Sequence, residues 1–480
     1  MSSLLLSFAV STVLGYAIVS IFWPPRLRTR ATLLLRICLG AGLGLGATAC
    51  VSFACFVLVG SAGTIMPLVE GVLTLLLVGF YVIRLPRGRS DEHAPVPAGP
   101  SRSKVTWLAF AVFMAMLLVG AASLVAITCL KPHGDWDAFA TWNNRARFLF
   151  RGCDPWQQAF SAVIPRAVGN YPPLLPLVVN RAWTYTQSDS VAGPICVAVL
   201  FTLGTVALTV CALHLLRGPT QAFLAGAALL GTPYLISHGA SQYADVPFAF
   251  FVLSALVLIT LHARFRPESH SLLVLAGLAT GRATVAKNEG AALVICLGAV
   301  GAFACLRTRP WTTGLKQAGS FAAGLAVPFG MLIYFKLYVG VGGGQLSGVT
   351  AHDAMTRLCD LSRYRDIAVE FLGQIIGIRT WGVLLIVLPV YRLLVGRGTA
   401  DSDRGVVRFS IVVLLLVLAT YWAMYLVSPL NLAWLLSTSS SRLILQLWPS
   451  AVFVLFLAAR TPEEALSRER ADRRPATRLT

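Results

Sequence analysis

The sequence predicts an all-α protein whose helices cross a membrane many times, and three observations predict it. Apolar residues make up 56% of the 480 residues and charged residues only 12%, about half the charged share of a soluble domain. The mean hydropathy is +0.74. Apolar runs of about 20 residues, the length that a helix needs to cross a bilayer, recur along most of the chain. Because backbone groups inside lipid must bond to one another, these runs should be helices.

The basic residues favour a membrane orientation rather than a nucleic-acid partner. The formal net charge is +19, but arginines gather in short linkers between apolar runs, as they do in cytoplasmic loops under the positive-inside rule. No basic strip interleaved with aromatic residues is present, so no nucleic acid is expected as a partner. The linker arginines are Arg26, Arg28, Arg30, Arg84, Arg87, Arg89, Arg264, Arg266, Arg307 and Arg309.

The first apolar run, residues 4–23, is predicted to be a retained helix that starts outside. Its basic flank follows it, whereas a secretory signal carries basic residues before its apolar run. From there the length and charge rules predict a transmembrane bundle of about 13 spans. They cover residues 4–23, 32–60, 64–83, 105–130, 191–216, 222–237, 246–263, 272–286, 291–306, 319–338, 380–395, 406–428 and 443–459.

These spans divide the chain into four parts. Three N-terminal transmembrane helices come first, and a flexible cytoplasmic linker rich in Pro, Arg and Ser follows them. The main bundle comes next, with two sizeable outer loops, and the chain ends in a basic cytoplasmic tail. The parts are residues 1–83, 84–104, 105–459 and 460–480, and the outer loops are 131–190 and 339–379.

The predicted orientation places most acidic residues on one side. Glu70 is the only acid clearly within a span, whereas a transporter is expected to hold several ionisable groups near the middle of the membrane. The polar chemistry is therefore expected at the outer face. The acids at or near that face are Asp135, Asp137, Asp154, Asp245, Glu289, Asp353, Asp360, Asp366 and Glu370.

The first outer loop begins with two carboxylates, Asp135 and Asp137. If a helix starts at Asp137, then Trp142, Arg145 and Phe148 recur at helical spacing and indicate an amphipathic helix at the membrane surface. A carboxylate held there suits a general base for a hydroxyl acceptor. The alternative is that the two Asp side chains only cap the helix.

Two further motifs lie at the outer starts of helices. Residues 170–176 begin Asn170, Tyr171 and contain three prolines, which fix an extended approach to the next helix and put Tyr171 at the interface. Residues 242–247 place Asp245 at the start of a span, where it serves either chemistry or helix capping.

Two cationic positions complete the set. The short spans 272–286 and 291–306 meet at Lys287, Asn288 and Glu289, where a charged pair inside the membrane is costly unless it is used or paired. Lys287 and Glu289 either bind a lipid-borne phosphate or stabilise the break by pairing with each other. Arg442 starts the last span and suits bidentate phosphate binding, or serves as an interfacial anchor.

The motifs of soluble cofactor sites are missing from the sequence. It contains no metal-ligand spacing, P-loop, dinucleotide fingerprint or GxSxG. The sequence therefore identifies no cofactor, and it leaves dependence on a divalent metal open.

Taken in order, these motifs resemble the GT-C class of membrane glycosyltransferases, in particular the bacterial branch related to protein O-mannosyltransferases and lipid A aminoarabinose transferases. The resemblance covers roughly residues 105–459. It implies a GT-C-like bundle whose first outer loop carries amphipathic interfacial helices and the catalytic acid. It also implies a sugar donor linked to polyprenyl phosphate.

The resemblance assigns roles to residues of this chain. Asp137 matches the catalytic acid, with Asp135 as second choice. Lys287, Arg442 and Arg145 are similar to the donor-phosphate cations, and Asp245 matches a second outer acid. Further candidates are Glu289, Asn288, Tyr171 and Trp142. The sequence departs from the family pattern at Asn170, where relatives often carry Asp.

The function that the resemblance implies is transfer of a sugar, with inversion, from the polyprenyl-phosphate donor to an acceptor hydroxyl. The protein is then expected in the bacterial inner membrane, with its active site on the outer face. Its partners are membrane lipid and a glycan, lipid or protein acceptor. Two rivals remain: a transporter or flippase for envelope glycolipids, and a scaffold that has lost catalysis. No internal repeat supports the transporter.

Overall fold

The computed structural model describes residues 2–84, 103–164, 169–265, 269–342, 348–398 and 401–472. Across these ranges the regular structure is helical, without a strand, and a single bridge joins Arg397 to Ala459. The all-α prediction is therefore confirmed for the described chain. Most of the predicted linker (85–102) and the end of the basic tail (473–480) lie outside the described residues.

Ten helices of the described chain are long and apolar enough to cross a membrane. They are α1 (Ser2–Phe22), α2 (Arg30–Val59), α3 (Ile65–Ile83), α4 (Lys104–Leu130), α7 (Ala192–Arg217), α10 (Asp245–Phe265), α12 (Gly290–Arg307), α13 (Trp311–Tyr338), α18 (Asp401–Val427) and α19 (Leu432–Ala458). Three shorter apolar helices are α8 (Pro219–Leu230), α11 (Ser271–Ala286) and α17 (Leu384–Val395). The protein is thus a multi-pass helical membrane protein.

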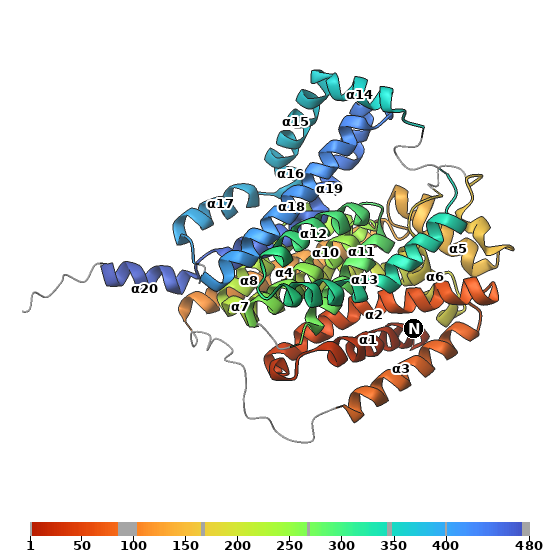
Figure 1. The fold of residues 1–480 in the computed structure, drawn as a ribbon, viewed down its shortest axis with the longest axis horizontal. Helices are drawn as coiled ribbons and strands as arrows, with labels where there is room; N and C mark the ends of the chain where they lie inside the picture. Colours follow the sequence, from red (N-terminus) through yellow and green to blue (C-terminus); the bar gives the residue numbers. More distant parts are fainter. Residues whose placement is uncertain are drawn as a thin grey trace, which may run out of the picture.

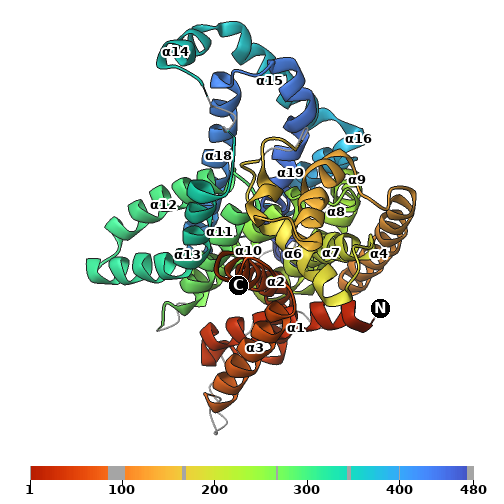
Figure 2. The same cartoon turned by 90° about the vertical axis from the view of Figure 1, so that its right-hand side faces the viewer.

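The remaining elements lie between these helices, except α20, which follows the last of them. They are η1 (Pro25–Leu27), η2 (Ala138–Trp142), α5 (Asn143–Arg151), η3 (Trp156–Phe160), α6 (Leu174–Thr186), α9 (Pro233–Ala240), α14 (Ala351–Cys359), α15 (Leu361–Ile376), α16 (Ile378–Trp381) and α20 (Pro462–Asp472). In Figure 1, α5 and α20 lie at opposite ends of the bundle. Figures 1 and 2 both show α14 and α15 at one edge, beside the ends of α18 and α19, and α3 at the opposite edge.

Several predicted spans have different bounds in the structure. The span predicted over 222–237 is wrong as one helix, because α8 ends at Leu230 and α9 begins at Pro233, and proline disfavours helical backbone in the residue before it. The span 380–395 is also interrupted, at Gly382, where φ is +65°. Finally, α19 begins 11 residues before the predicted Leu443.

The early start of α19 has a local cause. Its first half contains five consecutive hydroxyl residues, 437–441, which read as polar loop. The hydroxyls of Ser437 and Thr438 instead donate to the Trp434 carbonyl one turn back, at 3.0 and 2.8 Å. Hydroxyl groups that bond to their own helix can remain inside a span.

The N-terminal helices are part of the packed bundle. Helix α2 packs against α1, α6 and α7. Gly44 lets α1 and α2 approach closely, since a Cβ there would lie 1.9 Å from the carbonyl oxygen of Ser11. Near the C-terminal end of α2, Phe53 and Phe56 pack on Trp156 with ring centroids 5.9 and 5.5 Å apart. The α2 helix therefore lies in the interior rather than at the periphery.

Candidate functional site

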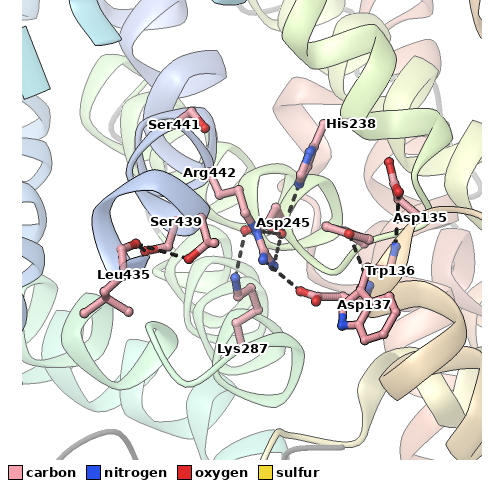
Figure 3. Close-up of polar contacts among 12 residues, drawn as sticks. Asp135, Trp136, Asp137, His238, Asp245, Lys287, Leu435, Ser439, Ser441 and Arg442 are labelled. Atoms are coloured by element: carbon pink, nitrogen blue, oxygen red, sulfur yellow. Dashed lines mark hydrogen bonds and ion pairs between the residues drawn. The ribbon is translucent and has the colours of Figure 1, made fainter. Parts of the chain in front are cut away.

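Four charged residues from distant parts of the chain meet at one place (Figure 3). Asp137 precedes η2, Asp245 begins α10, Lys287 follows α11, and Arg442 lies in α19. The Lys287 Nζ lies 2.7 Å from Asp245 Oδ1, and the Arg442 Nη2 lies 3.0 Å from Asp245 Oδ2. The Arg442 Nη1 also lies 2.7 Å from Asp137 Oδ2. The structure thus brings together four of the residues singled out in the sequence.

Asp245 is the centre of this cluster and is fully buried, at 0% exposure. Besides the two cations, the Gln446 Nε2 donates to its Oδ1 at 2.8 Å. The His238 Nε2 lies 3.3 Å from its Oδ2. Burial lowers the pKa of His238 and outweighs the opposite effect of Asp245. Four side chains therefore enclose the Asp245 carboxylate, two of them cations.

Lys287 is held between two carboxylates. Its Nζ lies 3.0 Å from Glu289 Oε1 in addition to its contact with Asp245. Burial alone would lower the pKa of Lys287, but Asp245 and Glu289 overcome this and keep the pKa above its usual value. The pairing of Lys287 with Glu289, one of the two alternatives read from the sequence, is therefore present in the structure.

The cluster holds more negative than positive charge. Three carboxylates face two cations, which gives a formal net charge of −1 for the five groups. These groups are Asp137, Asp245, Glu289, Lys287 and Arg442. An incoming anion must therefore compete with carboxylates for the cations, and the Asp137–Arg442 contact is the most accessible place to do so, because both side chains are partly exposed.

The cluster borders a cavity of about 1020 Å³, a volume at the upper limit of the pockets that hold small ligands. Its lining includes five residues predicted from the sequence: Asp135, Asp137, Tyr171, Asn288 and Arg442. Lys287 is not on this lining, because Asp245 and Glu289 enclose it. The half-exposed indoles of Trp136 and Trp434 border the cavity, as do the hydroxyl residues Thr438 and Ser439.

The two acids of the first outer loop have different surroundings. Asp135 is exposed and pairs with Lys131 at 2.9 Å, and its Oδ1 accepts a bond from the Trp136 N–H. Asp137 makes no side-chain capping bond, and its backbone N–H donates to the Tyr243 hydroxyl at 3.1 Å. The capping alternative therefore does not describe Asp137, whose carboxylate points to Arg442.

In the expected amphipathic helix after Asp137, the side chains of Trp142 and Arg145 are buried within the protein, where α5 packs on α6. Phe148, the third residue at the same helical spacing, is exposed. Trp142 stacks on Tyr171 with ring centroids 5.3 Å apart. The Arg145 guanidinium lies 5.3 Å from the Phe160 ring, and burial lowers the pKa of Arg145 to about 10. These residues support the cavity wall from behind.

Several side chains of the site were not predicted from the sequence. His238, Tyr243 and Gln446 contact the acids directly. Lys336 of α13 donates to the Asn288 Oδ1 at 2.7 Å and to the backbone carbonyl of Asn170. Gln446 could have been predicted from the sequence, because an amide inside an apolar span requires a hydrogen-bond partner. His238 could not have been predicted, because its contact with Asp245 depends on how α9 and α10 pack in space.

No group of three His, Cys, Asp or Glu side chains that could hold a metal ion is found in the part of the chain that the structure describes. Comparisons of the chain with protein families, curated proteins and solved structures find no match. The fold and the site define a multi-pass helical membrane protein with a buried cluster of acids and bases beside a cavity. Its chemistry is inferred from this geometry and from the sequence motifs.

Proposed function

We propose that the protein is a GT-C-like membrane glycosyltransferase that moves a sugar from a polyprenyl-phosphate donor to an acceptor hydroxyl at the outer face of the inner membrane. The observation that carries the proposal is the meeting of Asp137 and Arg442 at the edge of the cavity, over the buried Asp245–Lys287 pair. A potential base and a phosphate-binding cation are thereby adjacent at one accessible place.

The contact between Asp137 and Arg442 suggests how donor binding prepares the base. A donor phosphate that binds the Arg442 Nη1 replaces Asp137 as its anionic partner, since guanidinium forms charge-assisted hydrogen bonds with carboxylate and phosphate oxygens alike. Asp137 then faces the cavity without its arginine. Asp245 keeps its own contact with Arg442 and so holds the guanidinium in place.

In the transfer step, Asp137 accepts the proton of the acceptor hydroxyl. The acceptor oxygen forms a bond to the anomeric carbon as the bond between that carbon and the phosphate oxygen breaks. Polyprenyl phosphate leaves with the electron pair, and Arg442 offsets the charge that develops on it. The attack comes from the face opposite the leaving group, so the sugar is transferred with inversion.

A transporter or flippase for envelope glycolipids is the second candidate. The observation that favours it is a further buried ion pair away from the cavity, between Glu70 of α3 and Arg181 of α6, with Nε and Oε1 2.7 Å apart. Ionisable pairs inside a bundle are frequent along transport pathways.

The test is the variant Asp137→Asn, assayed with the purified full chain, a radiolabelled polyprenyl-phosphate sugar and cell-envelope acceptors. We expect transfer to fall by about 10² to 10⁴-fold, the contribution typical of a general base. The matched control is Asp189→Asn, because Asp189 also pairs with an arginine, Arg151 at 2.6 Å, and its side chain is 30% exposed against 25% for Asp137.

Two outcomes would contradict the proposal. Near-normal transfer by Asp137→Asn would remove Asp137 from its role. Movement of labelled lipid across the bilayer without cleavage of the sugar–phosphate bond would favour the transporter instead.

A further inference from the structure

Two arginines meet at the end of the N-terminal helices, on the side of the bundle away from α5 (Figure 1). Arg28 follows η1, and Arg36 lies in the second turn of α2. The Arg28 Nη2 donates to the Ser20 carbonyl at 2.9 Å, and the Arg36 Nη1 donates to the Ser20 hydroxyl at 3.4 Å. Arg36 is only 6% exposed, so its charge is held inside the protein.

Neither arginine has an acidic partner among the residues that the structure describes. Instead, the Arg28 guanidinium lies 5.5 Å from the Tyr81 ring, and the Arg36 guanidinium lies 5.4 Å from the Tyr16 ring. Three buried nitrogens have no hydrogen-bond acceptor: Nε and Nη1 of Arg28 and Nε of Arg36. Burial lowers the pKa of Arg28, and the nearby Arg36 charge acts in the same direction.

Buried guanidinium donors without acceptors are costly, and a group that supplies several anionic oxygens would satisfy them. Phosphate is such a group, and guanidinium binds it bidentately. Two adjacent cations also favour an anionic headgroup over a headgroup without net charge. The chemistry of Arg28 and Arg36 therefore favours a phosphate as their ligand.

The surroundings of the pair indicate that this phosphate belongs to a lipid. Apolar side chains at the start of α2 and the end of α3 are exposed, among them Leu33, Ile37, Phe80 and Val82. Such a surface suits acyl chains and not a dissolved ion. Tyrosines beside arginines are typical of the membrane interface, and basic pockets between helices on the cytoplasmic side bind anionic headgroups.

We propose that the ends of α1, α2 and α3 form a binding site for the phosphate of an anionic membrane lipid in the inner leaflet, with Arg28 and Arg36 as its ligands. The site lies in the N-terminal helices, outside the cavity, and does not depend on the proposed glycosyl transfer. It gives these helices a specific contact with the bilayer.

The test compares thermal unfolding of the detergent-purified full chain with added phosphatidylglycerol, phosphatidylcholine of the same acyl chains, or inorganic phosphate. We expect phosphatidylglycerol to raise the melting temperature, with little effect of the other two. Arg28→Gln should weaken the lipid effect by about tenfold in half-saturating concentration, since a charge-assisted contact is lost. Arg28 is only partly buried, so this variant should fold.

The matched control is Arg307→Gln, which removes the same charge from an exposed arginine at the end of α12, 4.4 Å from the Phe303 ring. It should respond to phosphatidylglycerol like the unmodified chain. If Arg36→Gln fails to fold, Arg36→Lys keeps the charge but loses the bidentate geometry and should bind more weakly. An unchanged response of Arg28→Gln would overturn the proposal. Equal stabilisation by phosphatidylcholine or by inorganic phosphate would overturn it too.

Discussion

Asp137 and Asp245 share one arginine but have opposite surroundings. Asp245 is enclosed by side chains from α9, α19 and the segment after α11, whereas the Asp137 carboxylate contacts Arg442 and otherwise faces the cavity. A fully enclosed carboxylate cannot approach a substrate proton, while one at the cavity edge can. Burial, more than sequence position, therefore separates the residue that positions Arg442 from the residue that we propose as the base.

The same contrast predicts an effect on stability. Asp245→Asn leaves Lys287 and Arg442 without their shared buried carboxylate. We expect it to destabilise the protein by about 3–5 kcal/mol, the cost of breaking a buried ion pair. The measurement is thermal unfolding in detergent. Asp135→Asn is the control, because its pair with Lys131 is exposed and such pairs contribute little. Equal melting temperatures for Asp245→Asn and the unmodified chain would refute the central role of Asp245.

At this scale the sequence predicted the charged members of the site better than their partners. Asp137, Asp245, Lys287 and Arg442 stand out because charges are expensive in apolar surroundings, and the structure brings them together. Arg145 was singled out instead by its helical spacing after Asp137 and by the resemblance, and it lies behind the cavity wall. The residue type shows only that this charge needs a partner, and the packing of α5 on η3 shows that its neighbour is the Phe160 ring.

Among the elements, the sequence predicted helices well and their interruptions less well. Every predicted span contains a helix, since apolar length alone determines this. The break between α8 and α9 and the early start of α19 were not predicted. Both depend on local hydrogen bonding: proline removes a donor at position 233, and hydroxyl groups at 437 and 438 bond to their own helix.

The close packing of α1 and α2 leads to a prediction about the stability of this helix pair. Gly40 and Gly44 lie one turn apart, a spacing that lets membrane helices approach closely. Gly44→Ala would put a Cβ 1.9 Å from the Ser11 carbonyl oxygen, so we expect α1 and α2 to separate and the protein to lose about 1–3 kcal/mol of stability.

Its control is Gly79→Ala in α3, where an added Cβ meets nothing within 4 Å. That change should leave the melting temperature equal or slightly higher, because alanine favours a helix over glycine. If both variants melt alike, the close approach of α1 and α2 is not a significant source of stability.

For the whole molecule, the N-terminal helices fill space that the main bundle cannot fill by itself. A Cβ at Gly42 would lie 2.0 Å from Phe250 of α10, and one at Gly46 would lie 2.5 Å from Arg282 of α11. In addition, Glu70 is the carboxylate partner of the buried Arg181. The first 83 residues look separable in the sequence because the basic linker follows them, yet their side chains and glycines fit against helices of the main bundle.

A chain that starts at Lys104 should therefore fail to fold. It would lose the α2 surface that covers α6 and α7, and Arg181 would be left as a buried cation without its carboxylate, which is strongly destabilising. Expressing residues 1–84 as a separate chain alongside it should restore a monodisperse complex, because the contacts run between helices and not through the linker. Size-exclusion chromatography in detergent and co-purification through a tag on the short chain measure both results. A monodisperse Lys104 chain that melts at the temperature of the full protein would show that the N-terminal helices are dispensable for the fold.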